Sequence, residues 1–357
     1  MVPNHPLYNY TCHKRAPAAP GALSVWAMFW VCIVAGAGVS AKAGQNRTLA
    51  ALEQRYAAFS QKHGFNLGGP VWRGANYAMG EMAGRSVKKL RSGRYNAYVY
   101  QTSSAVHQAY YHAVAAADHI GLLRRTFEDG SFGVEVHSVD GVNVSRDLLD
   151  SVSEMLFLHK AFLYRPGGVG GLSVLDVGGG YGRLTKRFHD CWPESKYRVT
   201  DGMAISTFLA RQYLSRYGLA KRVVPLDEVD TFLAKTKVDL LVNTHSFPEM
   251  AAADVEFWLR RAKQHRVRYL FIVPNGRLTA EPSLRTNAGE SISDMIAGLG
   301  YRLVLFENFF VNSLRLCWQP GGRGQPLESA ACDWPDFTSR TFDYAVPYYL
   351  FELVGSV

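Results

Sequence analysis

Cysteine is scarce in this chain, and its few copies form no recognisable pair. None of their spacings gives a C-x-x-C motif: Cys12, Cys32, Cys191, Cys317 and Cys332. An odd count without a pattern argues against a disulfide scaffold and against a zinc finger. The histidines of one predicted helix, His107, His112 and His119, also lack the i, i+4 spacing of a helical metal site, so we expect no bound metal.

Internal repeats and low-complexity tracts are lacking too, and only 19% of the residues are charged against 48% hydrophobic. A chain of 357 residues with this composition can bury one large core, or one large and one small, as a folded enzyme does. The net charge is +9, with basic residues gathered at 88–91 and 260–268. Such a surface can bind nucleic acid or an anionic glycan, or it can be a set of solvated helix faces. No RNA-binding motif accompanies the charges, so we expect no nucleic-acid partner.

Glycine, in contrast, is concentrated at residues 178–182, directly after a short apolar run that contains Asp176. An apolar-periodic stretch follows, so the pattern predicts a buried strand, a tight turn and the start of a helix. In such a turn backbone N–H groups can approach a nucleotide cofactor. A dinucleotide fingerprint, G-x-G-x-x-G counted from Gly178, would require glycine where Arg183 stands, which disfavours a nicotinamide cofactor.

The pattern that is present, Asp-x-Gly-x-Gly-x-Gly, resembles motif I of the class I S-adenosylmethionine-dependent methyltransferases. In that family the acid closes the first strand and the loop wraps the methionine part of the cofactor. The resemblance therefore implies S-adenosyl-L-methionine as the cofactor. The residues of this loop that we expect to bind or position it are Asp176, Gly178, Gly179, Gly180, Tyr181 and Gly182.

A second acid, Asp201, ends the next alternating run, about 25 residues after Asp176. An acid at the end of the second strand can accept hydrogen bonds from both ribose hydroxyls. The alternative is a helix N-cap, because an apolar-periodic helix over 206–217 follows. Ser206 is the better-placed cap, which leaves Asp201 for the ribose. Asp227, after a third expected strand, is a weaker candidate for the adenine edge.

Further strands and helices alternate over about 180 residues. Helices are expected at 251–266 and 291–299, the second opened by Ser291 with Asp294 three residues later. Strands are expected at 238–244, 268–273 and 302–306, with closing strands at 311–318 and 348–354. Alternation of this kind predicts an α/β fold, a parallel sheet with helices on both faces.

The region before the first strand, residues 44–170, is expected to be a mainly helical cap over the carboxyl edge of the sheet. Helix-like patterns cover 49–62 and 105–123, and an apolar stripe on a third helix begins near Leu148. This cap would supply the acceptor pocket, and residues 171–357 would form the cofactor-binding domain.

The segment Asn243-Thr-His-Ser-Phe-Pro-Glu-Met250 follows the fourth expected strand, whose carboxyl end borders the cofactor in an open α/β sheet. His245 has the unperturbed pKa of a general base, Glu249 is placed to orient or assist it, and Asn243 can hold cofactor or acceptor through its amide. The alternatives are a hydrogen-bonded loop histidine for His245 and a first-turn helix acid for Glu249.

Several segments together resemble the sugar O-methyltransferase family: 176–184, Thr200-Asp201, 243–250, Glu128-Asp-Gly-Ser-Phe-Gly133 and Val144-Ser-Arg-Asp-Leu-Leu149. The similarity runs from about residue 90 to about residue 310. It implies a Rossmann-like class I methyltransferase fold and a carbohydrate hydroxyl as the acceptor, hence an S-adenosylmethionine-dependent O-methyltransferase. The alternatives are a methyltransferase for a small-molecule or lipid acceptor, and a non-catalytic, methyltransferase-like interaction protein.

The N-terminal segment, residues 1–43, carries basic residues before an uncharged stretch at 16–41. That stretch is long enough to span a bilayer as one helix, and we expect membrane attachment through residues 22–41. It also resembles a signal peptide. A third interpretation is a mis-assigned start, with translation from Met28 and a cytoplasmic location.

Overall fold

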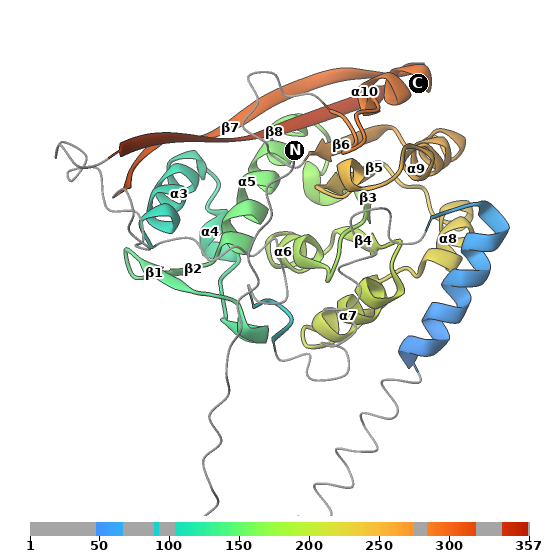
Figure 1. The fold of residues 1–357 in the computed structure, drawn as a ribbon, viewed down its shortest axis with the longest axis horizontal. Coiled ribbons are helices and arrows are strands. Elements are labelled where there is room, and N and C mark those ends of the chain that lie inside the picture. The colour runs from blue at the N-terminus through green and yellow to red at the C-terminus, as the bar shows by residue number, and fades with distance from the viewer. Residues whose placement is uncertain (1–47, 67–88, 93–103, 275–283, 319–337, 356–357) are drawn as a thin grey trace, which may run out of the picture. The chain divides into compact units, whose positions relative to one another are not determined.

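Six strands form the central sheet of the computed structural model, which describes residues 48–66, 89–92, 104–274, 284–318 and 338–355. In order across the sheet they are β4 (Lys196–Thr200), β3 (Ser173–Val177), β5 (Leu240–Thr244), β6 (Tyr269–Val273), β8 (Thr338–Leu353) and β7 (Tyr301–Trp318). The first four strands run parallel, and β8 runs antiparallel to β6 on one side and to β7 on the other (Figure 1).

The parallel strands form because their aliphatic residues are buried on both faces. In β3, Leu175 and Val177 belong to one core, whereas Val174 belongs to the other. A strand that is covered on both faces is a nearly continuous apolar run rather than an alternating one. Asp176 interrupts this run, and with 2% of its surface exposed it lies inside the protein.

Helices cover both faces of the sheet and make three layers. The residues of one core come from a helix at 48–63 and from α7 (Ala204–Ser215), α8 (Val229–Lys235), α9 (Ala252–Gln264) and α10 (Ile292–Gly298). Those of the other core come from α3 (Ser104–Ala117), α4 (Leu122–Arg125), α5 (Arg146–Ala161) and α6 (Arg183–Cys191). Strand order and helix placement are those of a Rossmann-like class I methyltransferase, so the predicted fold class is confirmed.

The described part of the region before the sheet is mainly helical, as expected, but it is not helical throughout. It includes a hairpin of β1 (His137–Val139) and β2 (Val142–Val144), and α3 ends at Ala117 instead of continuing to residue 123. The hairpin turn is Asp140-Gly141, and both residues have positive φ, as the type I′ turns of two-residue hairpins require.

Helix α5 also packs in a different place from the one expected. Its apolar stripe covers a face of the sheet rather than the carboxyl edge, and Phe157 stacks on Phe271 of β6 with ring centroids 5.2 Å apart. An apolar stripe along a helix is stabilised when it is buried against another apolar surface, here the face of the sheet. The periodicity therefore predicted the helix correctly but not the surface that it covers.

Four of the expected strands differ in extent from those of the structure. The strands expected at 302–306 and 311–318 are one strand, β7, with irregularities at 303/305 and 311/314, and β8 begins at residue 338 rather than 348. The third strand, expected before Asp227, is reduced to one bridge between Val199 and Val223. Pro225 follows that bridge and starts a 3-10 turn, η5 (Leu226–Glu228); proline has no N–H with which to extend a ladder.

Candidate cofactor and catalytic site

The glycine-rich turn lies at the carboxyl end of β3 and is hydrogen-bonded to the end of β4. The N–H groups of Gly178 and Gly179 donate to the carbonyl of Thr200 at 2.9 and 3.2 Å. Gly178 has φ +72°, and a Cβ built on it would lie 2.0 Å from Oγ of Ser246, so a larger residue does not fit. A Cβ on Gly180 would meet no atom of the described residues within 4 Å, so that side of the turn is open.

The chain leaves β3 and β5 toward opposite faces of the sheet. Helix α6 follows β3 on one face, and α9 follows β5 on the other. Adjacent parallel strands with diverging connections mark the switch point at which open α/β sheets bind their ligands. The structure therefore brings the glycine turn and the 243–250 segment to one edge, as the sequence predicts.

Asp176 lies directly beneath the glycine turn. A Cβ added to Gly179 would be 2.7 Å from its Oδ2, and the same oxygen accepts a hydrogen bond from the hydroxyl of Tyr197 at 3.2 Å. Burial raises the pKa of Asp176 to about 7. Asp176 thus lies under the turn, and its predicted role in cofactor binding stays a prediction.

Asp201 is not free, contrary to the sequence-based expectation. Its Oδ2 accepts the N–H of Gly180 at 3.1 Å, and its Oδ1 accepts the N–H of Met203 at 2.8 Å. Helix α7 begins at Ala204, so Ser206 lies in its first turn and is not its N-cap. Burial raises the pKa of Asp201 to about 6, against the opposing effect of these hydrogen bonds. Asp201 thus joins the end of β4 to the glycine turn.

Asp227 lies in η5 and is held by the N-terminal helix. Arg55, in the helix spanning 48–63, donates from Nε to Oδ2 of Asp227 at 2.6 Å and also pairs with Glu228. Oδ1 of Asp227 is buried and has no hydrogen-bond partner among the described residues. Asp227, the predicted adenine contact, therefore has one carboxylate oxygen paired with Arg55 and one without a hydrogen-bond partner among the described residues.

The amide of Asn243 is used within the site. Its Nδ2 donates to the carbonyl of Val177 at 2.8 Å and to Oγ of Ser246 at 2.5 Å, and its Oδ1 accepts the N–H of Phe247 at 2.9 Å. Asn243 is 0% exposed. These contacts connect the end of β3 to the turn after β5. The amide of Asn243 therefore has a structural role instead of the predicted contact with a ligand.

His245 directly follows β5 and has φ +69°, a left-handed conformation that costs a residue other than glycine about 1 kcal/mol or more. Its N–H donates to the carbonyl of Val273 at 2.7 Å, and its Nδ1 lies 3.1 Å from the carbonyl of Pro274. A carbonyl only accepts, so Nδ1 carries the hydrogen and Nε2 is the basic nitrogen of the neutral ring. Burial lowers the pKa of His245 to about 4, so the ring is neutral at pH 7.

Glu249 ends a 3-10 turn, η6 (Phe247–Glu249), and is 6% exposed. It is not a first-turn acid of α9, which begins at Ala252 and has Asp254 in that position. Burial is the main cause of the raised pKa of Asp201, and the negative charge of Glu249 raises it further. The predicted part of Glu249 in assisting His245 stays a prediction.

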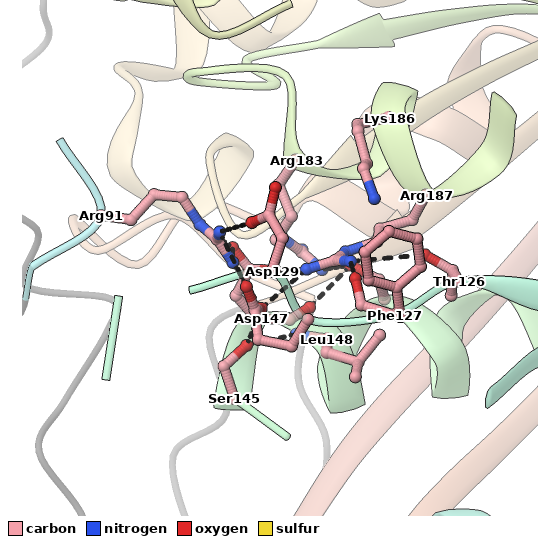
Figure 2. A network of polar contacts seen from close by, with 12 residues as sticks. Arg91, Thr126, Phe127, Asp129, Ser145, Asp147, Leu148, Arg183, Lys186 and Arg187 are labelled. Carbon is pink, nitrogen blue, oxygen red and sulfur yellow. Dashed lines mark hydrogen bonds and ion pairs between the residues drawn. The ribbon is translucent and has the colours of Figure 1, made fainter. Parts of the chain in front are cut away.

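Tyr181 lies in the glycine turn, but its hydroxyl donates to Oδ2 of Asp147 in α5. Asp147 belongs to a set of charged and polar side chains that we call the buried ionic cluster (Figure 2): Arg91, Glu128, Ser145, Asp147 and Arg187. Sequence reasoning missed this cluster. Its carboxylates lie in segments that carry the family resemblance, but no spacing connects them to the arginines.

The N-terminal stretch at 16–41 lies outside the described residues. Within the part of the chain that the structure describes, no helix combines the length and apolar character needed to cross a bilayer. The same residues contain no group of three histidine, cysteine or carboxylate side chains placed to hold a metal. The histidines of α3 have separate neighbours: His107 stacks on His137 at 3.9 Å, and His112 lies 3.7 Å from the carboxylate of Asp140.

No protein-family model matches the chain, and no curated protein is significantly similar to it in sequence. The resemblance to a sugar O-methyltransferase family is therefore not confirmed by sequence comparison.

Several solved structures are similar to this chain. The mitomycin 7-O-methyltransferase MmcR is 17% identical, with 70% of this chain and 68% of that one covered at a TM-score of 0.34. Magnesium protoporphyrin IX methyltransferase from Synechocystis PCC 6803, with bound S-adenosylmethionine, is 12% identical, with 68% and 97% covered at a TM-score of 0.34. Two further structures, from Pyrococcus horikoshii and Streptococcus pneumoniae, carry names that refer to RNA methylation. Identities and TM-scores this low define neither an activity nor an acceptor for this chain.

Proposed function

We propose that the chain binds S-adenosylmethionine at the switch point and transfers its methyl group to a sugar hydroxyl. The observation that carries this proposal is the junction of the glycine turn with Asp201, whose buried carboxylate holds the N–H of Gly180 at 3.1 Å. A glycine turn and an acid at the ends of adjacent parallel strands are the parts that hold a nucleoside beside backbone N–H groups.

The buried oxygens at this edge suit a ligand that is rich in hydrogen-bond donors. Oδ1 of Asp176 and Oδ1 of Asp227 have no hydrogen-bond partner among the described residues. Asp201 accepts two backbone N–H groups, and a carboxylate offers about four acceptor positions, so it retains capacity for ribose hydroxyls. The amino group of adenine is a donor of the kind that Asp227 can accept. The residues present therefore fit the cofactor.

Bound S-adenosylmethionine supplies a methyl group on a positively charged sulfur, already activated for displacement. The remaining task of the protein is to hold the acceptor in line and to remove its proton, a contribution of about 10²–10⁴-fold for a general base. His245 is placed for this task because its Nδ1–H is directed to the carbonyl of Pro274, which leaves Nε2 of the neutral ring as the basic nitrogen. Burial, which lowers its pKa to about 4, makes it a weaker base than an unperturbed histidine. Nε2 would take the hydroxyl proton, and the new oxygen–methyl bond would replace the sulfur–methyl bond of S-adenosylmethionine and leave S-adenosylhomocysteine.

Charged side chains act on His245, and their chemistry is compatible with a hydroxylated acceptor. After burial, the charges with the largest effect on its pKa are those of Asp150 and Arg183. Asp150 accepts a hydrogen bond from the hydroxyl of Tyr110 at 2.7 Å and lies 3.4 Å from Arg146. Carboxylate, phenol and guanidinium groups can bind sugar hydroxyls, whereas a lipid acceptor would require a predominantly apolar lining. The resemblance of the sequence motifs to sugar O-methyltransferases supports the same acceptor.

Calorimetric titration of the full chain with S-adenosylhomocysteine and, in parallel, with NAD tests the cofactor. We expect micromolar binding of S-adenosylhomocysteine alone; binding of NAD, or of neither ligand, contradicts the proposal.

The acceptor is tested by methyl transfer from labelled S-adenosylmethionine to monosaccharides, glycans, phenols and lipids, with His245→Ala as the control enzyme. Label in sugars that disappears in the variant is the expected result. Label found in phenols or lipids alone would support methyltransferase activity but contradict the proposal that the acceptor is a sugar. Binding of S-adenosylhomocysteine without transfer to any acceptor would favour the non-catalytic alternative.

A further inference from the structure

The charged side chains of the buried ionic cluster balance one another inside the protein. The exposed fractions of the side chains of Arg91, Glu128, Asp147 and Arg187 are all 2% or less. Arg91 lies 2.7 Å from Glu128 and 2.9 Å from Asp147, and Arg187 lies 2.8 Å from Glu128 and 3.2 Å from Asp147. Both carboxylates thus bind both guanidinium groups, an arrangement that holds all four side chains in one geometry (Figure 2).

The cluster connects segments that are far apart in the chain. Arg91 lies in a turn at residues 89–92, Glu128 precedes the 3-10 turn η2 (Ser131–Gly133), and Asp147 is in the first turn of α5. Arg187 comes from α6, whose N-cap is Gly182, the last residue of the glycine turn. The cluster therefore joins the upstream region to the helix that starts at the proposed cofactor site.

Tyr181 links the cluster to the glycine turn itself. It lies between Gly180, which is open on one side, and Gly182, and its hydroxyl donates to Asp147. Its ring packs edge-on against Tyr213 with centroids 5.0 Å apart. Burial, followed by the charge of Asp147, raises the pKa of Tyr181, so the hydroxyl stays protonated and continues to donate. A side chain fixed at both its ring and its hydroxyl fixes the backbone that carries it.

We propose that Tyr181 is a positioning residue for the cofactor, and that the buried ionic cluster, acting through the hydrogen bond between Tyr181 and Asp147, holds the glycine turn in its binding conformation. This inference rests on the proposed function for its ligand, S-adenosylmethionine. It gives the upstream segments around Glu128 and Asp147 a part in cofactor binding, although neither segment lies next to the glycine motif in the sequence.

The Tyr181→Phe variant tests the proposal because it removes one hydroxyl and keeps the ring against Tyr213. The matched control is Tyr217→Phe, which removes a hydroxyl that donates to Asp129 at 2.8 Å, at the rim of the cluster and outside the glycine turn. Two readouts are compared for both variants and the native chain: amide hydrogen exchange in the ligand-free protein, and calorimetric affinity for S-adenosylhomocysteine.

In Tyr181→Phe we expect the amides of 178–180 to exchange several-fold faster, while those of β3 are unchanged. We also expect affinity for S-adenosylhomocysteine to fall about tenfold, the effect of one hydrogen bond to a charged group. Tyr217→Phe should match the native chain in both readouts. Unchanged exchange at 178–180 would overturn the proposal, and so would faster exchange spread equally over β3, since that indicates a general loss of stability.

The two proposals fail in distinguishable ways. If the native chain does not bind S-adenosylhomocysteine, the proposed function fails, whereas the exchange data still decide whether Tyr181 holds the turn. If the native chain binds the ligand and Tyr181→Phe binds it equally well, the positioning proposal fails and the proposed function stands.

Discussion

Replacement of Arg91 by methionine measures what the buried ionic cluster contributes to folding. The guanidinium donates to both carboxylate oxygens of Glu128, at 3.0 and 2.7 Å, and to Asp147 at 2.9 Å. Methionine fills much of the same volume but leaves the two carboxylates with Arg187 as their guanidinium partner within the cluster. Removing one partner of a buried ion pair costs about 3–5 kcal/mol, because the other keeps an uncompensated charge. That is a large share of the roughly 5–15 kcal/mol by which a domain is stable.

The free energy of unfolding is measured by urea titration at pH 7, followed by circular dichroism and by tryptophan fluorescence. The control is Arg55→Gln, which also breaks two ion pairs, both of 2.6 Å, but at a side chain that is 42% exposed. Exposed pairs contribute about 0–1 kcal/mol, so this variant should stay close to the native chain. Losses of equal size in the two variants, or a loss below about 1 kcal/mol for Arg91→Met, would refute the reasoning.

Three further variants test the site. His245→Ala should lower kcat by about 10²-fold or more and leave the affinity for S-adenosylhomocysteine within a few-fold, as expected for a general base; unchanged turnover would remove this residue from the mechanism. Asp201→Ala should weaken S-adenosylhomocysteine binding in calorimetry by roughly 1.5–3 kcal/mol, the range for hydrogen bonds to charged groups, and equal affinity would leave this acid a purely structural part. Burial raises the pKa of Asp176 to about 7, against about 4 in an unfolded chain, so its contribution to stability is complete below about pH 4 and is lost as the pH rises toward 7. Asp176→Asn should therefore flatten the fall in melting temperature between pH 4 and pH 7, and an unaltered profile would contradict this assignment.

The parts of the site that could be predicted from the sequence are those that depend on neighbouring residues. The strand, glycine turn and helix around Asp176 follow from local apolar runs and from glycines at positions with positive φ. Ser291 caps α10 by accepting the N–H of Asp294 at 3.1 Å, as the capping pattern predicts. Parallel strand order then brings Asp201 and His245 to one edge of the sheet, since the carboxyl ends of parallel strands lie together.

The parts that could not be predicted depend on contacts between distant residues. Arg91 and Asp147 are 56 positions apart, and their pairing depends on where α5 packs, which periodicity does not define. The two hydrogen bonds to Asp201 come from Gly180 and Met203, and the first of these requires the folded turn. A solvent-accessible acid and a buried acid are identical in a sequence, so the buried state of Asp201 had no local signal.

Helix α5 precedes the glycine motif in the chain but lies inside the core that covers one face of the sheet. A fragment that begins at residue 171 would expose Val174, Leu240 and Phe271 to water. Exposure of each such side chain lowers the free energy of unfolding by about 1.5–3 kcal/mol. We therefore expect that a fragment starting at the first strand of the sheet does not fold stably by itself. The smallest autonomous folding unit therefore includes α5, Arg91 and also the helix at 48–63, whose Leu52 and Tyr56 are buried in the other core. Gene fusions or domain exchanges that keep these elements together should retain the fold.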